Sequence, residues 1–440
     1  MSDEITNYHG WGNYPRARHK AVVRPAWMDE ITPRQLAENA PLLAFGLGRS
    51  YGDSCLNDGG VLMDMRQLDR LLSFDSRTGL IVCEAGVSLS EILLLAVPHG
   101  WFLPVTPGTK HVTLGGAIAH DVHGKNHHVQ GTFGCHVEEL NLARSSGEII
   151  GCSLKENPEL FSATIGGMGL TGIIRWASLK LKRILSSQIS METVPFNDFH
   201  EFLRLSSDRE ADQWEYTVAW IDCFSGRRTR GLFMRGNHGE TGQLTPHSEK
   251  IKLNVPFNLP DNLLNRFTIK VFNALYYGAG CLRGGKSECH YDPFFYPLDK
   301  VNNWNRIYGH NGLTQYQCVV PESQVAAFQE ILERIAKAGQ GSFLGVIKRF
   351  GPCKSPGMMS FPRPGLTLAL DFPFRNEVTL KLFEDLDAVV MAAGGALYPA
   401  KDPRMSPAMF RSSYPRIDEF RKCIDPSLSS SFWRRVSRAT

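Results

Sequence analysis

The chain has 440 residues, a length that fits two or three domains with sizeable hydrophobic cores. Apolar residues make up 42% of the sequence and charged residues 21%, a balance that excludes a globally disordered protein. The 48 Lys and Arg against 44 Asp and Glu leave a net charge of +4, which is too small to indicate a nucleic-acid-binding protein.

The cysteines and the N-terminus bear on the compartment. Ten cysteines are scattered without a CxxC pair, which gives no support to a zinc ribbon and favours a reduced, intracellular protein. The first four residues contain an acidic pair and no apolar run, unlike a secretory signal. No stretch approaches the roughly 18 apolar residues of a membrane span. We therefore expect a cytoplasmic protein, with peripheral contact at the inner membrane surface at most.

The first half of the chain predicts short strands and short helices. Brief apolar runs closed by Gly or Asp predict strands at 42–45, 61–64 and 79–84. Ser88 followed by Glu91 matches a capping box and predicts a helix over 89–96. Further along, the pattern predicts a hairpin of 140–143 with 148–151, a helix over 157–164 capped by Asn157, and a strand over 173–182.

The second half is different in character. Longer amphipathic segments at 325–337 and 380–391 predict helices, and the Pro- and Asn-rich run 254–262 predicts a connector. From residue 394 the chain is again dense in Pro, Lys and Arg. Strand-rich and mixed segments in both halves favour an α+β fold over a doubly wound sheet.

Glycines cluster in two loops that point to a ligand held against bare backbone. The first runs from Gly46 through Gly48, Arg49, Ser50 and Tyr51 to Gly52, and consecutive backbone N–H groups in such a turn can bind an anion. Its spacing is G-x-G-x-x-x-G and no helix follows, so it is not a dinucleotide fingerprint of the Rossmann type. The second loop, 107–126, combines Gly108, Thr113, Gly115 and Gly116 with several histidines.

Two tempting motifs are rejected. The run from Gly167 to Gly172 matches G-x-G-x-x-G, but a predicted helix precedes it and a predicted strand follows, which inverts the Rossmann context. The histidines at 120, 123, 127, 128 and 136 do not predict a metal site, because Gly124 and Asn126 interrupt the helix that would align them and Lys125 adds a positive charge.

Taken in order, the glycine segments resemble the vanillyl-alcohol-oxidase type of FAD-binding fold (the PCMH type). That family has a pyrophosphate-binding first loop like 46–54, a P-G-x-x-x-x-T-x-G-G loop like 107–116, and a helix–glycine–strand element like 157–174. The resemblance implies a two-domain α+β fold, with an FAD-binding domain at 1–190 that is joined by 395–440. The substrate-binding domain, 191–394, is then built on an antiparallel sheet.

A closer resemblance, to the decaprenylphosphoryl-β-D-ribose 2-oxidase family, covers nearly the whole chain. It rests on the His-Gly-Lys-Asn-His-His loop at 123–128 and on motifs at 296–299, 304–306, 315–317, 348–352, 360–362, 371–373 and 398–402. Mycobacterial members carry Cys two residues before the Asp-Phe-Pro motif, where this chain has Ala369. The family oxidises C2 of a polyprenyl-phosphoryl ribose as the first half of an epimerisation to arabinose, which serves arabinan and cell-wall biosynthesis.

The resemblance implies a set of site residues. The catalytic candidates are Lys401 as substrate base or charge stabiliser, His123 beside the flavin, and Tyr51. Substrate-binding candidates are Lys125 for a phosphate, with Gln315, Gln317 and Lys348 for hydroxyls or phosphate. The implied cofactor site comprises Gly46, Gly48, Arg49, Ser50, Tyr51, Gly52, Gly108, Thr113, Gly115, Gly116, His120, His123, Gly124, Ile173 and Tyr398.

The resemblance also implies how the cofactor and partners are used. Related oxidases attach FAD through a His in the first loop, where this chain has Arg49, so noncovalent FAD is expected. A partner NAD(P)H-dependent keto-reductase would complete the epimerisation. The apolar and basic segment 254–286 is a candidate lid that meets a bilayer, or else a core helix of the second domain. Two alternatives stay open, an alditol or aldonolactone oxidase of the same fold and a flavin-free binding protein.

Overall fold

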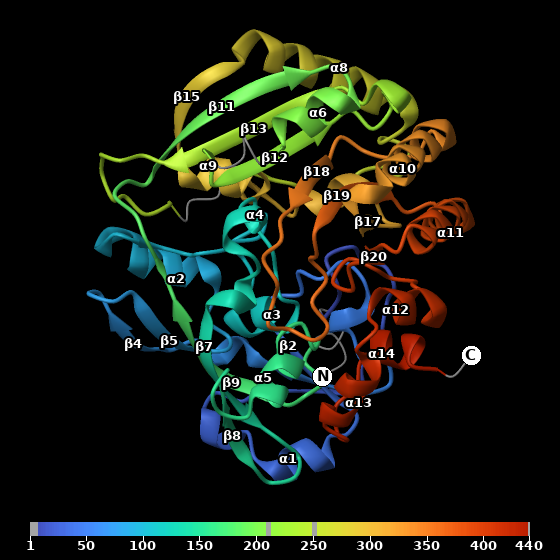
Figure 1. Cartoon of the computed structure of the whole chain (residues 1–440). Coiled ribbons are helices and arrows are strands. Elements are labelled where there is room, and N and C mark those ends of the chain that lie inside the picture. The colour runs from blue at the N-terminus through green and yellow to red at the C-terminus, as the bar shows by residue number, and fades with distance from the viewer. Residues whose placement is uncertain (1–7, 208–212, 249–252, 439–440) are drawn as a thin grey trace.

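The computed structural model describes residues 8–207, 213–248 and 253–438. The N-terminal tetrapeptide that argued against a secretory signal lies outside these residues. Among the described residues, most strands fall into three sheets, one of three, one of five and one of eight strands. The two smaller sheets lie in the lower half of the molecule and the large sheet in the upper half (Figure 1).

The lower half holds the first two sheets. A parallel sheet has the order β1 (Ala21–Val23), β3 (Val61–Asp64) and β2 (Leu42–Phe45). An antiparallel sheet has the order β4 (Leu71–Asp75), β5 (Leu80–Glu84), β9 (Ile173–Lys180), β7 (Val137–Ala143) and β8 (Ile149–Cys152). The strands predicted at 42–45, 61–64 and 79–84, and the predicted hairpin, are confirmed.

Short helices connect these strands: α1 (Pro33–Glu38), α2 (Leu89–Ala96), α3 (Leu114–Ala119), α4 (His127–Gln130) and α5 (Pro158–Thr164). The capping box of α2 is confirmed, with Ser88 and Glu91 exchanging side-chain and backbone hydrogen bonds. The expectation for α5 is wrong in one respect. Asn157 adopts a left-handed conformation and its side chain makes no cap hydrogen bond; its Nδ2 donates to the Gly151 carbonyl instead, at 2.8 Å.

The upper half is an antiparallel sheet of eight strands. Its order is β15 (Gly285–His290), β11 (Gln188–Phe196), β13 (Gly231–His238), β12 (Tyr216–Ile221), β18 (Gly345–Phe350), β19 (Gly365–Pro373), β17 (Leu313–Val320) and β20 (Ala396–Leu397). The expected antiparallel sheet of the second half is thus confirmed, although it begins before residue 191 and extends past 394. The division into two domains stays a prediction.

Three helices pack on the face of this sheet that is turned away from the cavity: α6 (Phe199–Leu205), α10 (Val325–Ala338) and α11 (Glu377–Ala392). The helix α8 (Arg266–Arg283) packs on the opposite face, against Trp220 of β12 and Leu232 of β13. The predicted helices at 325–337 and 380–391 are therefore confirmed. The helix α9 (Tyr291–Phe295) and two small strand pairs, β6 (Trp101–Phe102) with β10 (Lys182–Arg183) and β14 (Leu253–Asn254) with β16 (Val301–Asn302), complete the connections.

The C-terminal segment returns to the lower half as α12 (Pro407–Ser413), α13 (Ile417–Cys423) and α14 (Ser431–Val436). It runs beside the start of β2, where the Leu42 N–H donates to the Ser427 carbonyl and the Ser429 N–H to the Leu42 carbonyl. Its packing shapes the first glycine loop, because β2 leads directly into that loop. Residues far apart in sequence thus meet around one cavity.

Candidate active site

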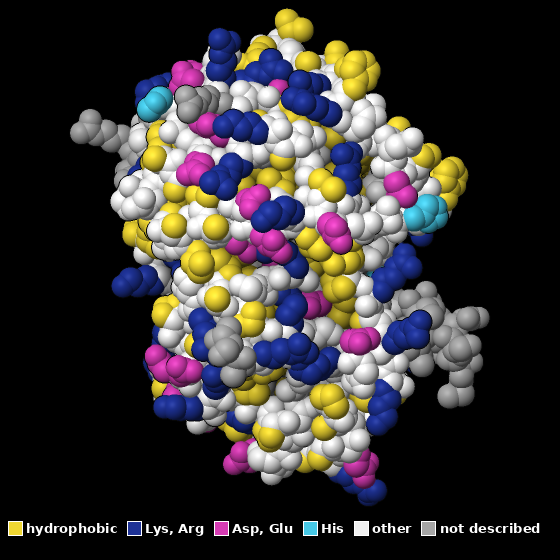
Figure 2. Space-filling model, turned by 90° about the vertical axis from the view of Figure 1, so that its right-hand side faces the viewer, with side chains coloured by type: hydrophobic (Ala, Val, Ile, Leu, Met, Phe, Trp, Pro, Cys, Tyr) yellow, Lys and Arg dark blue, Asp and Glu magenta, His cyan; other side chains and the backbone are white. Residues whose placement is uncertain are grey.

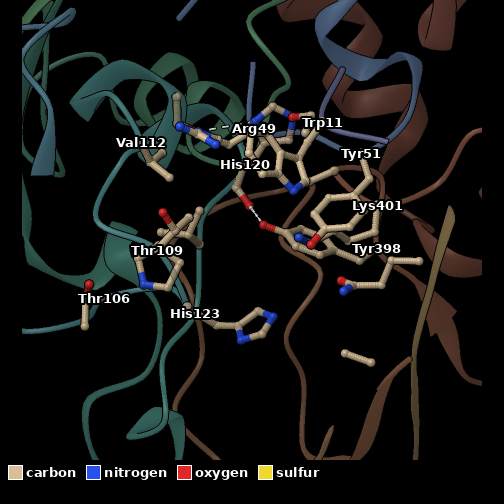
Figure 3. A pocket seen from close by; sticks show the side chains of 18 of the residues that line it. Trp11, Arg49, Tyr51, Thr106, Thr109, Val112, His120, His123, Tyr398 and Lys401 are labelled. Atoms are coloured by element: carbon tan, nitrogen blue, oxygen red, sulfur yellow. Dashed lines mark hydrogen bonds between the residues drawn. The ribbon is translucent and has the colours of Figure 1, made fainter. Parts of the chain in front are cut away.

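A cavity of about 670 Å³ lies between the two halves and takes its lining from both. The two glycine loops and the histidine loop line it from the lower half, and β12, β17, β18, β19 and α8 from the upper half. Figure 3 shows Lys401, Tyr51 and Tyr398 together on one side, with His123 and Thr109 on the other. Such a volume is typical of cofactor and substrate sites.

The two glycine loops touch each other at one point. A Cβ built on Gly46 would lie 2.4 Å from Thr113 Oγ1, so only glycine lets β2 approach the second loop this closely. Thr113 in turn begins α3 as its N-cap, and its Oγ1 accepts from the Gly116 N–H at 3.2 Å. The predicted Thr113 hydroxyl is therefore used within the loop, and it holds the loop in place.

The cavity fits the FAD that the family resemblance implies. Gly108 lines it, and a Cβ built there would meet nothing within 4 Å, so open space faces the bare backbone. The lining also carries the positive groups Arg49, Lys348 and Lys401, which suit a ligand that bears a pyrophosphate. Gly46, Gly48, Gly115 and Gly116 of the predicted set line the same cavity.

Two predicted cofactor residues are outside this lining. A Cβ on Gly52 would lie 2.1 Å from the Asp402 carbonyl oxygen, so Gly52 faces the C-terminal segment and serves close packing. The Ile173 side chain is fully buried in a hydrophobic cluster with Leu42 and Val61, whereas its neighbours Gly172 and Ile174 line the cavity. The alternation of side chains along β9 explains the second difference.

Lys401 stands at the centre of the site. Its Nζ lies 3.7 Å from the centroid of the Tyr51 ring, a cation–π arrangement (Figure 3). Burial lowers the pKa of Lys401 to about 8, and the nearby Asp371 carboxylate acts in the opposite direction. The predicted Lys401 and Tyr51 are therefore brought together, and a lysine with this pKa can exchange a proton near neutral pH.

Asp371 is a functional candidate that the sequence analysis did not assign. This residue of β19 is buried and lines the cavity, and its Oδ1 accepts from Gln315 Nε2 at 2.5 Å. Its Oδ2 is buried without a hydrogen-bond partner, and burial raises the pKa of the carboxyl to about 7. The signal was an acid at the end of the apolar run 366–370, which predicts a buried carboxyl.

Arg435 of α14 fixes two parts of the site at once. It pairs with Asp53 at 2.6 Å, directly after the first loop, and with Asp402 at 3.2 Å, directly after Lys401. The Tyr51 N–H also donates to the Ala400 carbonyl at 2.8 Å. This arrangement could not be predicted from local patterns, because its members are more than 30 residues apart in the chain. Asp402 is thus buried and paired with Arg435, so it does not form a surface ion pair with the neighbouring Lys401.

His123 lies among groups from the upper half. Lys348 Nζ lies 3.2 Å from His123 Nδ1 and donates to the Gly124 carbonyl at 3.2 Å, and Gln317 Nε2 lies 2.9 Å from His123 Nε2. Burial and the Lys348 charge hold the pKa of His123 well below its usual value, so the imidazole is neutral. Because an amide nitrogen only donates, Gln317 Nε2 donates to His123 Nε2, which places the ring proton of the neutral imidazole on Nδ1, beside Lys348 Nζ.

The two substrate lysines share the interior of the cavity. Burial is the main cause that lowers the pKa of Lys125 to about 8 and that of Lys348 to about 7, with Lys125 and Lys401 adding repulsion at Lys348. Lys125 Nζ is 3.5 Å from the Phe295 carbonyl oxygen. Repulsion among these groups favours an anionic ligand between them, because a negative charge restores the protonated forms.

His120 and Tyr398 join the second glycine loop to the C-terminal segment. The Tyr398 hydroxyl donates to the His120 carbonyl at 2.9 Å, the dashed bond in Figure 3. The His120 ring contacts the Gly116 carbonyl at 3.3 Å and Ser54 Oγ at 3.2 Å, with Ser50 Oγ at 3.5 Å. Burial lowers the pKa of His120 to about 4. Its ring is therefore neutral and engaged within the protein.

Arg49 does not stand free in the first loop. Its guanidinium lies 4.1 Å from the centroid of the Trp11 ring, and its Nε donates to the His111 carbonyl at 3.2 Å. Trp11, which the sequence analysis missed, also lines the cavity and holds the arginine at its wall. No signal in the sequence marks Trp11, since it is one aromatic residue in an irregular N-terminal segment.

The part of the cavity under α8 is apolar. Trp220 of β12 and Met234 of β13 line it together with Phe272 and Tyr276 of α8 and with Phe343. The Trp220 and Tyr276 rings meet edge to face at 4.7 Å, and Phe272 lies 5.1 Å from Phe343. Ala369 lines the cavity as well. The cavity thus joins a cationic interior to a hydrophobic region.

No group of three His, Cys, Asp or Glu side chains among the described residues is arranged to hold a metal ion. No described helix is both long and apolar enough to cross a membrane. The ten cysteines are all free thiols.

Comparisons with known proteins agree with this site. Residues 20–153 match the family model of an FAD binding domain. The chain is 38% identical to decaprenylphosphoryl-beta-D-ribose oxidase of Mycolicibacterium smegmatis, over 97% of this chain and 96% of that protein.

More distant relatives match less than half of the chain. L-gulono-1,4-lactone dehydrogenase of Mycobacterium tuberculosis is 26% identical over 43% of this chain and 42% of that protein. D-arabinono-1,4-lactone oxidase of Candida glabrata is 22% identical over 44% of this chain and 38% of that protein. The glycine-lined cavity, the FAD-domain match and the near-complete overlap with the mycobacterial enzyme together show that this chain is an FAD-dependent oxidoreductase of the decaprenylphosphoryl-β-D-ribose oxidase family.

Proposed function

We propose that this enzyme oxidises the C2 hydroxyl of a polyprenyl-phosphoryl-β-D-ribose to the 2-keto sugar. The observation that carries the proposal is the single cavity that joins glycine loops, a group of lysines and an apolar region. These three parts match an FAD, a sugar phosphate and a prenyl chain. The likeness to the mycobacterial oxidase supports the same substrate class.

The chain's own residues supply the acid–base chemistry. When bound, FAD supplies the two-electron acceptor for alcohol oxidation. Lys401 in its neutral form accepts the proton of the C2 hydroxyl, and the ammonium so formed faces the Tyr51 ring and Asp371. Both contacts stabilise the positive charge, so the lysine is suited to hold the proton until it is released.

The other polar groups bind and orient the sugar. Lys125 and Lys348 bind the phosphate, since an anion between them raises the pKa of both amines and keeps them protonated. Gln315 and Gln317 are held by Asp371 and His123 respectively, so each amide presents a fixed face to the sugar hydroxyls. His123 acts as a neutral hydrogen-bonding group beside the sugar.

The competing function is oxidation of an alditol or an aldonolactone, as the names of the more distant relatives indicate. Neither substrate carries a phosphate or a long apolar group. Neither gives a role to Lys125 and Lys348 or to the aromatic lining under α8. A flavin-free binding protein is no longer an alternative, because the family is one of FAD oxidoreductases.

We further propose that FAD is bound noncovalently, with the Arg49 guanidinium near the pyrophosphate. Arginine cannot attack a flavin methyl carbon, and the rings of His120 and His123 already contact Ser54, Gly116, Gln317 and Lys348. Acid precipitation tests this directly. Colour released to the supernatant is expected; colour retained in the pellet, with the intact chain heavier by one FAD, contradicts it.

The reaction calls for two partners. An NAD(P)H-dependent keto-reductase would reduce the 2-keto product to the arabinose epimer, since the keto sugar is not itself the end of an epimerisation. A lipid-linked substrate resides in a bilayer, so we propose peripheral contact with a membrane surface. We also propose that 1–190 with 395–440 binds FAD and that 191–394 binds the substrate.

The experiment is an anaerobic titration of the yellow holoenzyme. A short-chain prenylphosphoryl-β-D-ribose is expected to bleach the visible flavin absorption, and L-gulono-1,4-lactone or an alditol at equal concentration is not. Bleaching by the lactone or alditol with none by the phosphoryl ribose would favour the competing function. Phosphate-free ribose serves as the matched control for the lysines.

A further inference from the structure

Helix α8 carries an exposed apolar stripe along its whole length. Its outward positions follow helical spacing at 267, 271, 274, 275 and 282. Phe267 is 75% exposed, Leu275 70% and Leu282 90%. Exposed apolar groups of this size in one line are unusual on a soluble protein surface and mark a contact with something else.

The opposite face of α8 packs against the large sheet. Ile269 and Asn273 are buried, and Asn273 Nδ2 donates to Asp222 Oδ1 at 2.9 Å. A Cβ on Gly280 would lie 2.3 Å from Leu232 of β13, so the helix backbone approaches the sheet closely there. The helix is therefore anchored by one face, and its outward stripe is free of this packing.

The charged residues around the stripe are all basic, which indicates the kind of partner surface that it binds. Between residues 262 and 287 the chain has no Asp or Glu, and it has Arg266, Lys270, Arg283 and Lys286, all exposed. Figure 2 shows apolar and basic side chains together at the upper end of the molecule, where α8 lies in Figure 1. Apolar groups flanked by basic ones are typical of a helix that lies in the interface of an anionic membrane.

The stripe is also continuous with the active-site cavity. Phe272 and Tyr276 belong to the same helix and line the apolar part of the cavity. Further exposed apolar side chains precede the helix, at Phe257 and Leu263. A prenyl chain that leaves a bilayer at α8 would therefore pass from lipid to the aromatic lining without crossing bulk water.

We propose that the outward face of α8 is a docking surface for anionic lipid bilayers, through which the lipid-linked substrate enters. This inference rests on the proposed function for the substrate and on the structure for the surface. Phe267, Leu275 and Leu282 enter the acyl boundary, and the basic residues pair with lipid phosphates.

Flotation with vesicles tests the proposal. The holoenzyme is expected to float with vesicles of phosphatidylcholine and phosphatidylglycerol, and much less with pure phosphatidylcholine. The triple variant F267S/L275S/L282S should reduce the partition coefficient by more than about tenfold, because three apolar side chains no longer enter the lipid. The matched control is L154S/L185S, which changes two exposed leucines outside α8, 66% and 59% exposed, and should bind like the parent.

Other outcomes overturn the proposal. Equal flotation of the triple variant and the parent, or no flotation of the parent, shows that α8 is not a lipid surface. A parent dimer that the triple variant converts to a monomer, with no vesicle effect, assigns the face to a second copy of the chain. Turnover of a water-soluble short-chain substrate should be the same in parent and triple variant. If the parent turns over no phosphoryl ribose while vesicle binding holds, the proposed function fails and the surface stands.

Discussion

Lys401 is the residue on which the proposed chemistry depends most. Lys401→Ala is expected to keep its FAD, because the glycine loops that line the cavity are unchanged, and to bleach about 10² to 10⁴ times more slowly with substrate. Rapid mixing under anaerobic conditions measures the rate. Lys401→Arg is the control for charge alone, and it should also be slow because guanidinium does not accept a proton. A near-normal rate in the alanine variant would exclude Lys401 as the base.

Lys348 should set the pH dependence of substrate binding. Its pKa of about 7 in the free enzyme means that the amine loses its charge as the pH rises above about 7. KM for the phosphoryl ribose should therefore rise from pH 7 to pH 9, and this rise should be smaller in Lys348→Arg, whose charge is constant. An identical rise in both proteins would assign the pH dependence to another group.

Burial of Lys348 should lower the free energy of unfolding near pH 7. The folded protein releases the Lys348 proton near pH 7, whereas the unfolded chain holds it to the ordinary lysine pKa near 10.4. Because the unfolded state binds more protons between these values, this group makes the free energy of unfolding increase with pH across that window. Lys348→Met should raise Tm of the apoprotein at pH 7 and weaken its rise toward pH 10. An unchanged Tm profile would contradict the buried charge.

At the scale of elements, glycines of the two loops have different roles: one faces the cofactor cavity and another allows close packing of the backbone. Gly108→Ala places a methyl group in open space in the cavity, so Tm of the apoprotein should stay unchanged while FAD affinity falls. Gly52→Ala places its methyl group 2.1 Å from the Asp402 carbonyl oxygen. It should therefore lower the free energy of unfolding by about 1–3 kcal/mol, and Tm with it, in the presence and in the absence of FAD. Thermal melts and flavin titration check both. The reverse pattern would show that the roles are exchanged.

The sequence predicted local elements well where their signals were local. The capping box of α2 and the amphipathic helices α10 and α11 depend on residues within one or two turns. Clustered glycines indicated backbone brought close to another group, and the order and spacing of the three glycine segments carried the resemblance to the FAD-binding fold. The strand predicted at 173–182 is wrong at its end, because β9 ends at Lys180 and the chain leaves the sheet at Leu181, before β10 pairs with β6.

At the scale of the whole molecule, contacts between segments that are far apart in the chain could not be predicted from the sequence. The Arg435 ion pairs, the Trp11 cover of Arg49 and the place of Asp371 beside Lys401 depend on how the two halves meet. The prediction that Gly52 and Ile173 contact the cofactor is not supported, again because it depends on tertiary packing. Their neighbours line the cavity, and only the tertiary packing shows that these two face elsewhere.

One measurement tests the central claim most directly, the primary isotope effect on anaerobic flavin bleaching. Substrate carrying deuterium at C2 of the prenylphosphoryl ribose should bleach the flavin several times more slowly than the unlabelled sugar. Substrate labelled at C3 should react at the unlabelled rate, because that bond is not broken. Bleaching that slows with the C3 label, or that does not occur with either sugar, would contradict oxidation at C2.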